Sequence, residues 1–157
     1  MQRMRVETKV MTQNTHKIEI AMEYLDTAAV LWLQNSKPFS SLHLAGAAEE
    51  LSGKMCRIMK INSEFDEIKL LLKRIIKDFN LPHTEKDIRN LAYEAKNSVK
   101  HMDSRTSANV NINAREEASH LIQSAFNNFK KLGLDDMLSG AVHAVIEENA
   151  IYIEIDD

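Results

Sequence analysis

Two polar stripes lie side by side along one predicted helix, between residues 84 and 101. At about 100° of rotation per residue, one stripe comprises Arg89, Tyr93, Lys96 and Lys100. Cations around an aromatic ring suit the binding of a nucleic-acid backbone and the stacking of a base. The neighbouring stripe sets an imidazole beside amide and carboxylate side chains, and it comprises Asn90, Glu94, Asn97 and His101.

The imidazole of His101 is the group in these stripes best suited to proton transfer. Its unperturbed pKa of roughly 6.5 lets it exchange protons near neutral pH, and a position near the end of a helix favours its protonated form. General acid–base catalysis uses such a group. Every surface helix also has a polar face, so a solvated face without chemistry explains the same pattern.

A second candidate residue lies in the stretch AGAAEELSGK, where Glu49 stands at the rim of an apolar arc between Gly46 and Gly53. Glycines inside a helix cost about 1 kcal/mol each relative to alanine, so they indicate close approach of another helix. Glu49 would then be partly buried and would need a partner, and the candidates are Lys96, Lys100 and His101. In the alternative, Glu49 stays in solvent while the adjacent glutamate forms an i,i+4 pair with Lys54.

Other familiar sites are missing from the sequence. It has no Gly-rich phosphate loop, no CxxC pair, no HExxH and no GxSxG. Glu117 and His120 form one ExxH step, but di-iron bundles need two such steps and two further carboxylates. We therefore expect no metal centre and no cofactor.

Helices must position these residues, because apolar side chains recur at helical spacing along most of the chain. Only 4 Gly and 2 Pro interrupt them. Expected N-caps are Thr15, Ser63, Thr84 and Asn113, the second and third in approximate capping boxes with Asp66 and Asp87. We expect a loop over 102–113 and a strand or extended arm near 151–155, and helices that span about 15–34, 40–60, 63–79, 84–101, 113–132 and 135–148.

The 157 residues contain no internal repeat and no linker, so we expect one all-α, up-and-down bundle of five to six helices. The bundle should span 14–149, between an N-terminal arm (1–13) and an acidic C-terminal arm (150–157), with both arms short and extended or disordered. Residues 1–13 hold three cations and one carboxylate, and residues 147–157 hold five carboxylates and no cation. The net charge is −3, so any nucleic-acid contact needs a local patch.

The single cysteine, Cys56, and the lack of an apolar run of 18 residues lead us to expect a cytoplasmic protein without membrane contact.

The string Lys96-Asn97-Ser98-Val99-Lys100-His101 resembles the motif of the HEPN superfamily of small helical bundles. That motif is an Arg, commonly followed by a polar residue such as Asn, with a His four to six residues beyond it. Asn97, Lys100 and His101 fit, and Lys96 replaces the Arg, without its bidentate fork. AGAAEELSGK looks like the paired-glutamate second helix of HEPN-type proteins, including AbiV-like phage-defence proteins, and YLDTAAVLWLQNSKPFSSLHLA has the matching first-hairpin spacing. The likeness covers about residues 16–105.

The resemblance implies a homodimer that cleaves RNA without metal, in a toxin–antitoxin, stress or phage-defence system. The RNA 2′-hydroxyl would attack the adjacent phosphate, with RNA and an antitoxin or other partner protein as partners. His101 would transfer protons, Lys96 would stabilise the phosphorane, and Asn97 would orient His101 or the phosphate. RNA binding would use Arg89, Tyr93 and Lys100, with Glu49 and Glu94 in support. The alternative is a non-catalytic helical interaction (dimerisation) module with a degenerate motif.

Overall fold

Six α-helices and one short 3₁₀ helix make up the computed structural model, which describes residues 13–99 and 108–150 and has no strand within those ranges. The all-α prediction is confirmed. In chain order the elements are α1 (Lys17–Leu33), α2 (Pro38–Ile58), α3 (Glu64–Asp78), α4 (Glu85–Ser98), α5 (Ala114–Lys131), η2 (Asp135–Met137) and α6 (Gly140–Glu148).

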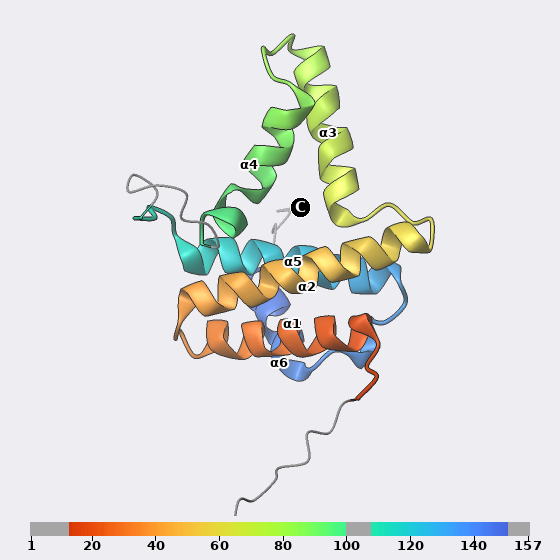
Figure 1. Cartoon of the computed structure of the whole chain (residues 1–157), viewed down its shortest axis with the longest axis vertical. Coiled ribbons are helices and arrows are strands. Elements are labelled where there is room, and N and C mark those ends of the chain that lie inside the picture. Colours follow the sequence, from red (N-terminus) through yellow and green to blue (C-terminus); the bar gives the residue numbers. More distant parts are fainter. Residues whose placement is uncertain (1–12, 100–107, 151–157) are drawn as a thin grey trace, which may run out of the picture.

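Four helices, α1, α2, α5 and α6, pack against one another into a body (Figure 1). Their apolar stripes meet in a core in which the large side chains are sealed from solvent. Such burial stabilises the fold by roughly 25 cal/mol per Å² of apolar surface. The largest of these sealed apolar side chains are Leu25, Leu42, Ile122, Phe129, Val142 and Val145.

The other two helices, α3 and α4, form a hairpin that projects from the body on the side of α2 and α5 (Figure 1). Both helices begin with the predicted capping box: Ser63 with Asp66 on α3, and Thr84 with Asp87 on α4. The apolar side of α3 is not covered, and no residue of this helix is fully buried. The hairpin is therefore ordered locally by its caps but leaves an apolar surface open.

Two helix starts differ from the predicted ones. The N-cap of α1 is His16 and not Thr15, because the His16 ring nitrogen Nδ1 accepts a hydrogen bond from the Ile18 amide at 3.2 Å. The second helix begins at Pro38, two residues before the predicted Ser40. Proline suits the first helical turn because its missing N–H has no partner there in any helix.

The last predicted helix, 135–148, is broken into two pieces. A single 3₁₀ turn, η2, covers Asp135–Met137, and α6 starts only at Gly140. Ser139 separates them because its hydroxyl accepts a hydrogen bond from the Val142 amide at 3.3 Å, which makes it an N-cap. The sequence holds this Ser-x-x-Val cap, which the apolar periodicity alone does not reveal.

Some predictions fall outside the described residues: most of the N-terminal arm, the first part of the 102–113 loop, and the strand or arm at 151–155. Residues 108–113 are described and are not helical, as predicted. Within the two described ranges, every helix is too short or too polar to cross a lipid bilayer.

Candidate functional site

Lys96 is turned into the protein and is only 4% exposed. Its ammonium Nζ lies 3.3 Å from Glu50 Oε2 and 3.5 Å from Glu49 Oε2, so it joins α4 to α2 through two ion pairs. The prediction of an open cationic stripe is therefore wrong at this position. A cation sealed by two carboxylates is not free to contact an RNA phosphate.

Gly46 makes this burial feasible. A Cβ atom added to Gly46 would lie 2.9 Å from both Cγ and Cδ of Lys96, closer than real Cβ contacts allow. The aliphatic stem of the lysine thus runs directly over the glycine, while its charged end reaches the two glutamates. The interpretation that a glycine in this helix permits close approach of another helix is confirmed for Gly46.

Glu49 is 3% exposed, and the cation beside it is Lys96. Burial raises the pKa of Glu49 above its ordinary value, and the Lys96 ammonium opposes that rise only in part. Glu49 is buried more completely than the predicted partial burial, and of its three predicted partners Lys96 forms the ion pair. The pair named in the alternative also forms, since Lys54 Nζ lies 2.8 Å from Glu50 Oε1. Hydrogen bonding from Lys54, reinforced by Lys96, lowers the pKa of Glu50 to about 2.

Tyr93 lies between two neighbours and is not an open platform for a base. Its ring centroid is 4.5 Å from that of Phe65 on α3, and Lys96 Nζ lies 4.4 Å from it. Burial raises the pKa of the phenol, which keeps it neutral. The predicted stacking surface is therefore wrong for Tyr93, whereas Arg89 is exposed. The buried side of α4 is wider than its apolar stripe because α2 and α3 both contact this helix.

An open groove of about 940 Å³ runs between α3 and α4. Apolar side chains of α3 form one wall, and polar side chains of α4 form the other. The polar wall is the second predicted stripe, so Asn97 and Glu94 face the groove while Lys96, one residue away, faces the body. The wall residues that matter here are Leu72, Ile75 and Ile76 on α3, and Asn90, Glu94 and Asn97 on α4.

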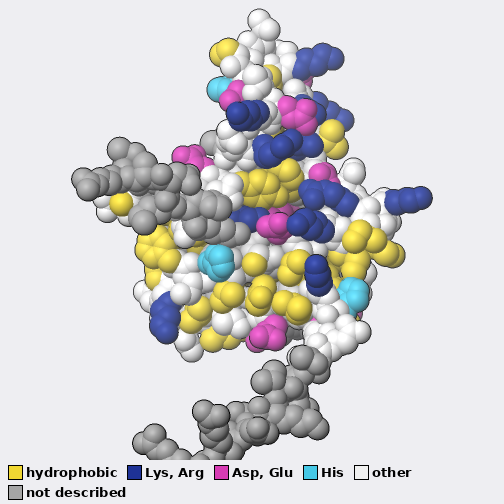
Figure 2. All heavy atoms as spheres, viewed as in Figure 1, with side chains coloured by type: hydrophobic (Ala, Val, Ile, Leu, Met, Phe, Trp, Pro, Cys, Tyr) yellow, Lys and Arg dark blue, Asp and Glu magenta, His cyan; other side chains and the backbone are white. Residues whose placement is uncertain are grey.

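The predictions for Lys100 and His101 lie outside the described residues. Of the proposed catalytic residues, the structure therefore places only Lys96 and Asn97, and it sets them in different environments. Figure 2 shows cationic and anionic side chains interleaved over this face of the hairpin. A surface of mixed sign attracts a phosphate backbone less than a basic one.

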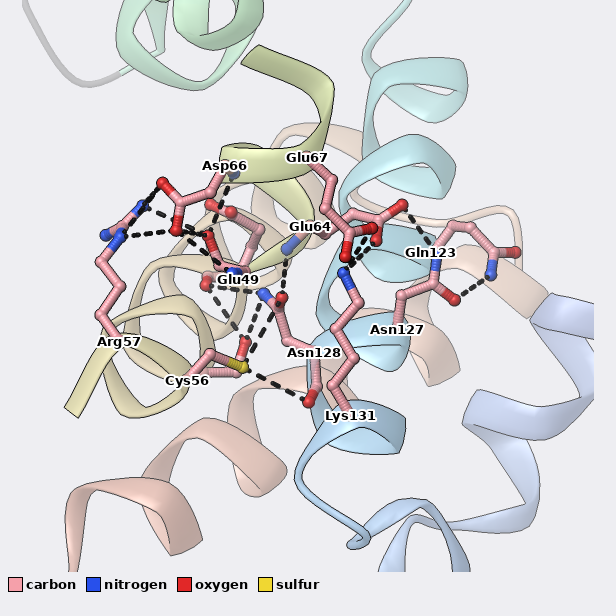
Figure 3. A network of polar contacts seen from close by, with 12 residues as sticks. Glu49, Cys56, Arg57, Glu64, Asp66, Glu67, Gln123, Asn127, Asn128 and Lys131 are labelled. Carbon is pink, nitrogen blue, oxygen red and sulfur yellow. Dashed lines mark hydrogen bonds and ion pairs between the residues drawn. The ribbon is translucent and has the colours of Figure 1, made fainter. Parts of the chain in front are cut away.

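A second polar network fixes the base of the hairpin to the body (Figure 3). Arg57 Nε of α2 lies 3.0 Å from Asp66 Oδ2 of α3. Burial opposes ionisation of Asp66, but hydrogen bonds from Arg57 and Ser63 outweigh it and lower the pKa of this carboxyl. On the other side, Lys131 of α5 lies 3.0 Å from Glu64 Oε2.

The amide of Asn128 is fully buried at the centre of this network (Figure 3). Its Oδ1 accepts a hydrogen bond from the Glu64 amide at 2.7 Å, and its Nδ2 donates to Ser52 Oγ at 3.2 Å. One side chain thereby links α2, α3 and α5. Asn128, Arg57 and Lys131 are not predictable from local sequence patterns, because each contacts a residue on another helix. The predicted Ser63–Asp66 capping box was the only local signal for this region.

Among the described residues, no three His, Cys, Asp or Glu side chains form a group that could hold a metal ion. A scan against protein-family models, a search of curated proteins and a search of solved structures each found no match to this chain. Membership of the HEPN superfamily therefore stays a prediction based on the sequence motifs.

Proposed function

We propose that this chain is a non-catalytic interaction module that binds an amphipathic helix in the groove between α3 and α4. The observation that carries the proposal is the uncovered apolar side of α3. Ile75 lines the groove and is 38% exposed, and Leu71 beside it is 57% exposed. Contiguous apolar surface of this kind, rimmed by polar residues, is typical of a helix-binding groove.

The polar wall of the groove indicates the kind of helix that would bind. It carries the carboxylates of Asp87 and Glu94, together with Asn90 and Asn97. A helix with one apolar stripe and basic flanks would place its stripe on α3 and its cations near these carboxylates. The burial of Lys96 favours this function over phosphate chemistry, because the lysine is already neutralised by Glu49 and Glu50.

Binding of a helical peptide tests the proposal. A labelled peptide with one leucine stripe and lysine flanks is titrated with the full chain and followed by fluorescence anisotropy. Ile75→Glu places a charge in the apolar wall and should weaken binding at least about tenfold. Leu70→Glu is the matched control, because Leu70 is 51% exposed on the same helix but lies about 140° from Ile75 around it.

A scrambled peptide of the same composition controls for attraction by charge alone. Equal binding of the two peptides, or equal loss of binding in the two variants, would contradict helix recognition by this groove. Circular dichroism of both variants checks that the helices are retained.

A metal-independent endoribonuclease is the second candidate, because Asn97 and Glu94 of the predicted motif region stand on the open groove wall. The test incubates structured RNA in EDTA with the wild-type chain and, in parallel, with the His101→Ala variant. Cleavage that disappears in the variant would support the enzyme. Intact RNA with a folded wild-type chain would reject it.

A further inference from the structure

Helix α3 itself matches the helix that the groove should bind. Its exposed apolar side chains recur at the spacing of one stripe, and they include Ile68, Leu71 and Ile75. The second half of the helix, residues 72–78, carries three cations and one carboxylate, and the cations are Lys73, Arg74 and Lys77. Lys73 lies 3.2 Å from Glu85 of its own hairpin, and the other two form no ion pair with another described residue. The chain thus presents an amphipathic helix with a basic second half beside a groove whose far wall carries carboxylates.

Two identical hairpins related by a two-fold axis can cover each other's apolar stripes. In such an isologous contact each copy gives its α3 and receives the partner's α3, so both apolar stripes are covered at once. The two α3 helices run antiparallel in this arrangement. With the axis between Leu71 and Leu72, Ile68 of one copy faces the partner's Ile75, and leucines meet at the centre.

The charges of the hairpin are compatible with this pairing. The antiparallel arrangement brings the basic half of one α3 toward the partner's hairpin, where the α4 wall carries Asp87 and Glu94. Arg74 and Glu94 are both exposed, and neither forms an ion pair with another described residue. Opposite charges at the rim guide association and disfavour partners of the wrong charge.

We infer that the occupant of the groove is α3 of a second copy, so that two α3–α4 hairpins form an intermolecular four-helix bundle. This inference rests on the proposed helix-binding function and names the partner of the same groove.

The association state of the full chain tests the inference. Sedimentation equilibrium at micromolar concentrations should show a dimer for the wild type. Ile75→Glu should weaken dimerisation at least about a hundredfold, because two copies of the charge enter one apolar contact. Leu70→Glu, on the far side of the same helix, should leave the dimer within about twofold of wild type.

Disulfide crosslinking tests the orientation independently of any loss of folding. Leu71→Cys places a thiol beside the proposed axis, where it should form a covalent dimer under mild oxidation. Leu70→Cys places a similarly exposed thiol about 100° around the helix from Leu71 and about 140° from Ile75, away from the proposed contact, and should not crosslink. The native Cys56 is buried and does not interfere.

A monomeric wild type, a dimer that Ile75→Glu leaves intact, or crosslinking through position 70 but not 71 would each overturn the inference. Failure of the inference is separable from failure of the proposed function. A monomer that still binds the amphipathic peptide, and loses it in Ile75→Glu, retains the helix-binding groove with a different protein as partner. A monomer that binds no peptide rejects both.

Discussion

The four-helix body and the α3–α4 hairpin are held by different forces. In the body, Phe129 and its neighbours are completely buried, so apolar packing supplies the stability. In the hairpin, α3 has no fully buried residue. Ion pairs attach the hairpin instead, through Lys96 on one side and through Arg57 and Lys131 on the other.

This difference explains why the hairpin keeps an open apolar face. Ion pairs and hydrogen bonds fix direction, because each needs a particular geometry, whereas apolar burial is non-directional and proceeds until surface is covered. A hairpin held by charges at its base can therefore stand out from the body with Leu71 and Ile75 uncovered. Apolar packing alone would favour its collapse onto α2 and α5.

The largest expected change in stability comes from replacing a buried phenylalanine of the body, compared with an exposed phenylalanine of the hairpin. Phe129→Ala leaves a cavity in the sealed core of the body and should lower the free energy of unfolding by about 4 kcal/mol. Phe79→Ala, in a side chain 73% exposed at the end of α3, should change it by less than about 0.5 kcal/mol. Urea denaturation measures both values. Equal effects would show that the hairpin shares the core of the body.

Removal of the buried cation should have the next largest effect. Lys96→Met leaves Glu49 buried without its partner and should cost about 3 kcal/mol of unfolding free energy at neutral pH. Combining Lys96→Met with Glu49→Gln removes the unpaired charge and should recover most of that loss. A double-mutant cycle by urea denaturation gives the coupling. Additive effects would mean that the two side chains do not interact.

The pH dependence of stability should reveal Glu49 directly. Burial raises its pKa in the folded state above the ordinary value of 4.5. The stability that it contributes is therefore fully present below pH 4.5 and is lost as pH rises through the folded pKa. Asp66 shows the opposite pH dependence, because its pKa is lowered in the folded state. The stability that it contributes is present above its ordinary pKa of 3.8 and is lost as pH falls through the lowered value.

The measurement compares the wild type with Glu49→Gln from pH 4.5 up to neutrality. The free energy of unfolding of the wild type should fall relative to that of the variant over this range. A difference that is constant, or that rises with pH, would show that the folded pKa of Glu49 is not raised.

The exposed ion pair between Lys54 and Glu50 should matter least. Their side chains are 60% and 43% exposed, so solvent screens the attraction. Lys54→Ala should change the free energy of unfolding by less than about 0.5 kcal/mol. Urea denaturation of Lys54→Ala and Lys96→Met compares their losses of unfolding free energy. A loss as large as that of Lys96→Met would contradict the distinction between exposed and buried pairs.

The sequence predicted most helices because local rules govern them. Both capping boxes of the hairpin follow from residues three apart, and apolar spacing located the body helices. The break at Ser139 was not predicted, because the apolar spacing continues through it and indicates one uninterrupted helix. The sequence offered Lys96 only as one of three possible partners of Glu49, and it did not decide which side of α4 faces α2. A lysine is ordinarily exposed, and only Glu49, Glu50 and Gly46 together make its burial favourable.

By itself, the sequence determined an all-α chain, its capped helices, the apolar stripe of α3 and the two polar stripes of α4, because periodicity and caps act over a few residues. Only the tertiary structure decided that Lys96 faces inward, that Asn97 faces the groove, and that the stripe of α3 is left uncovered. The reason is physical. The rotation per residue of a helix sets which side chains share a face, but contacts between distant segments decide which face is buried.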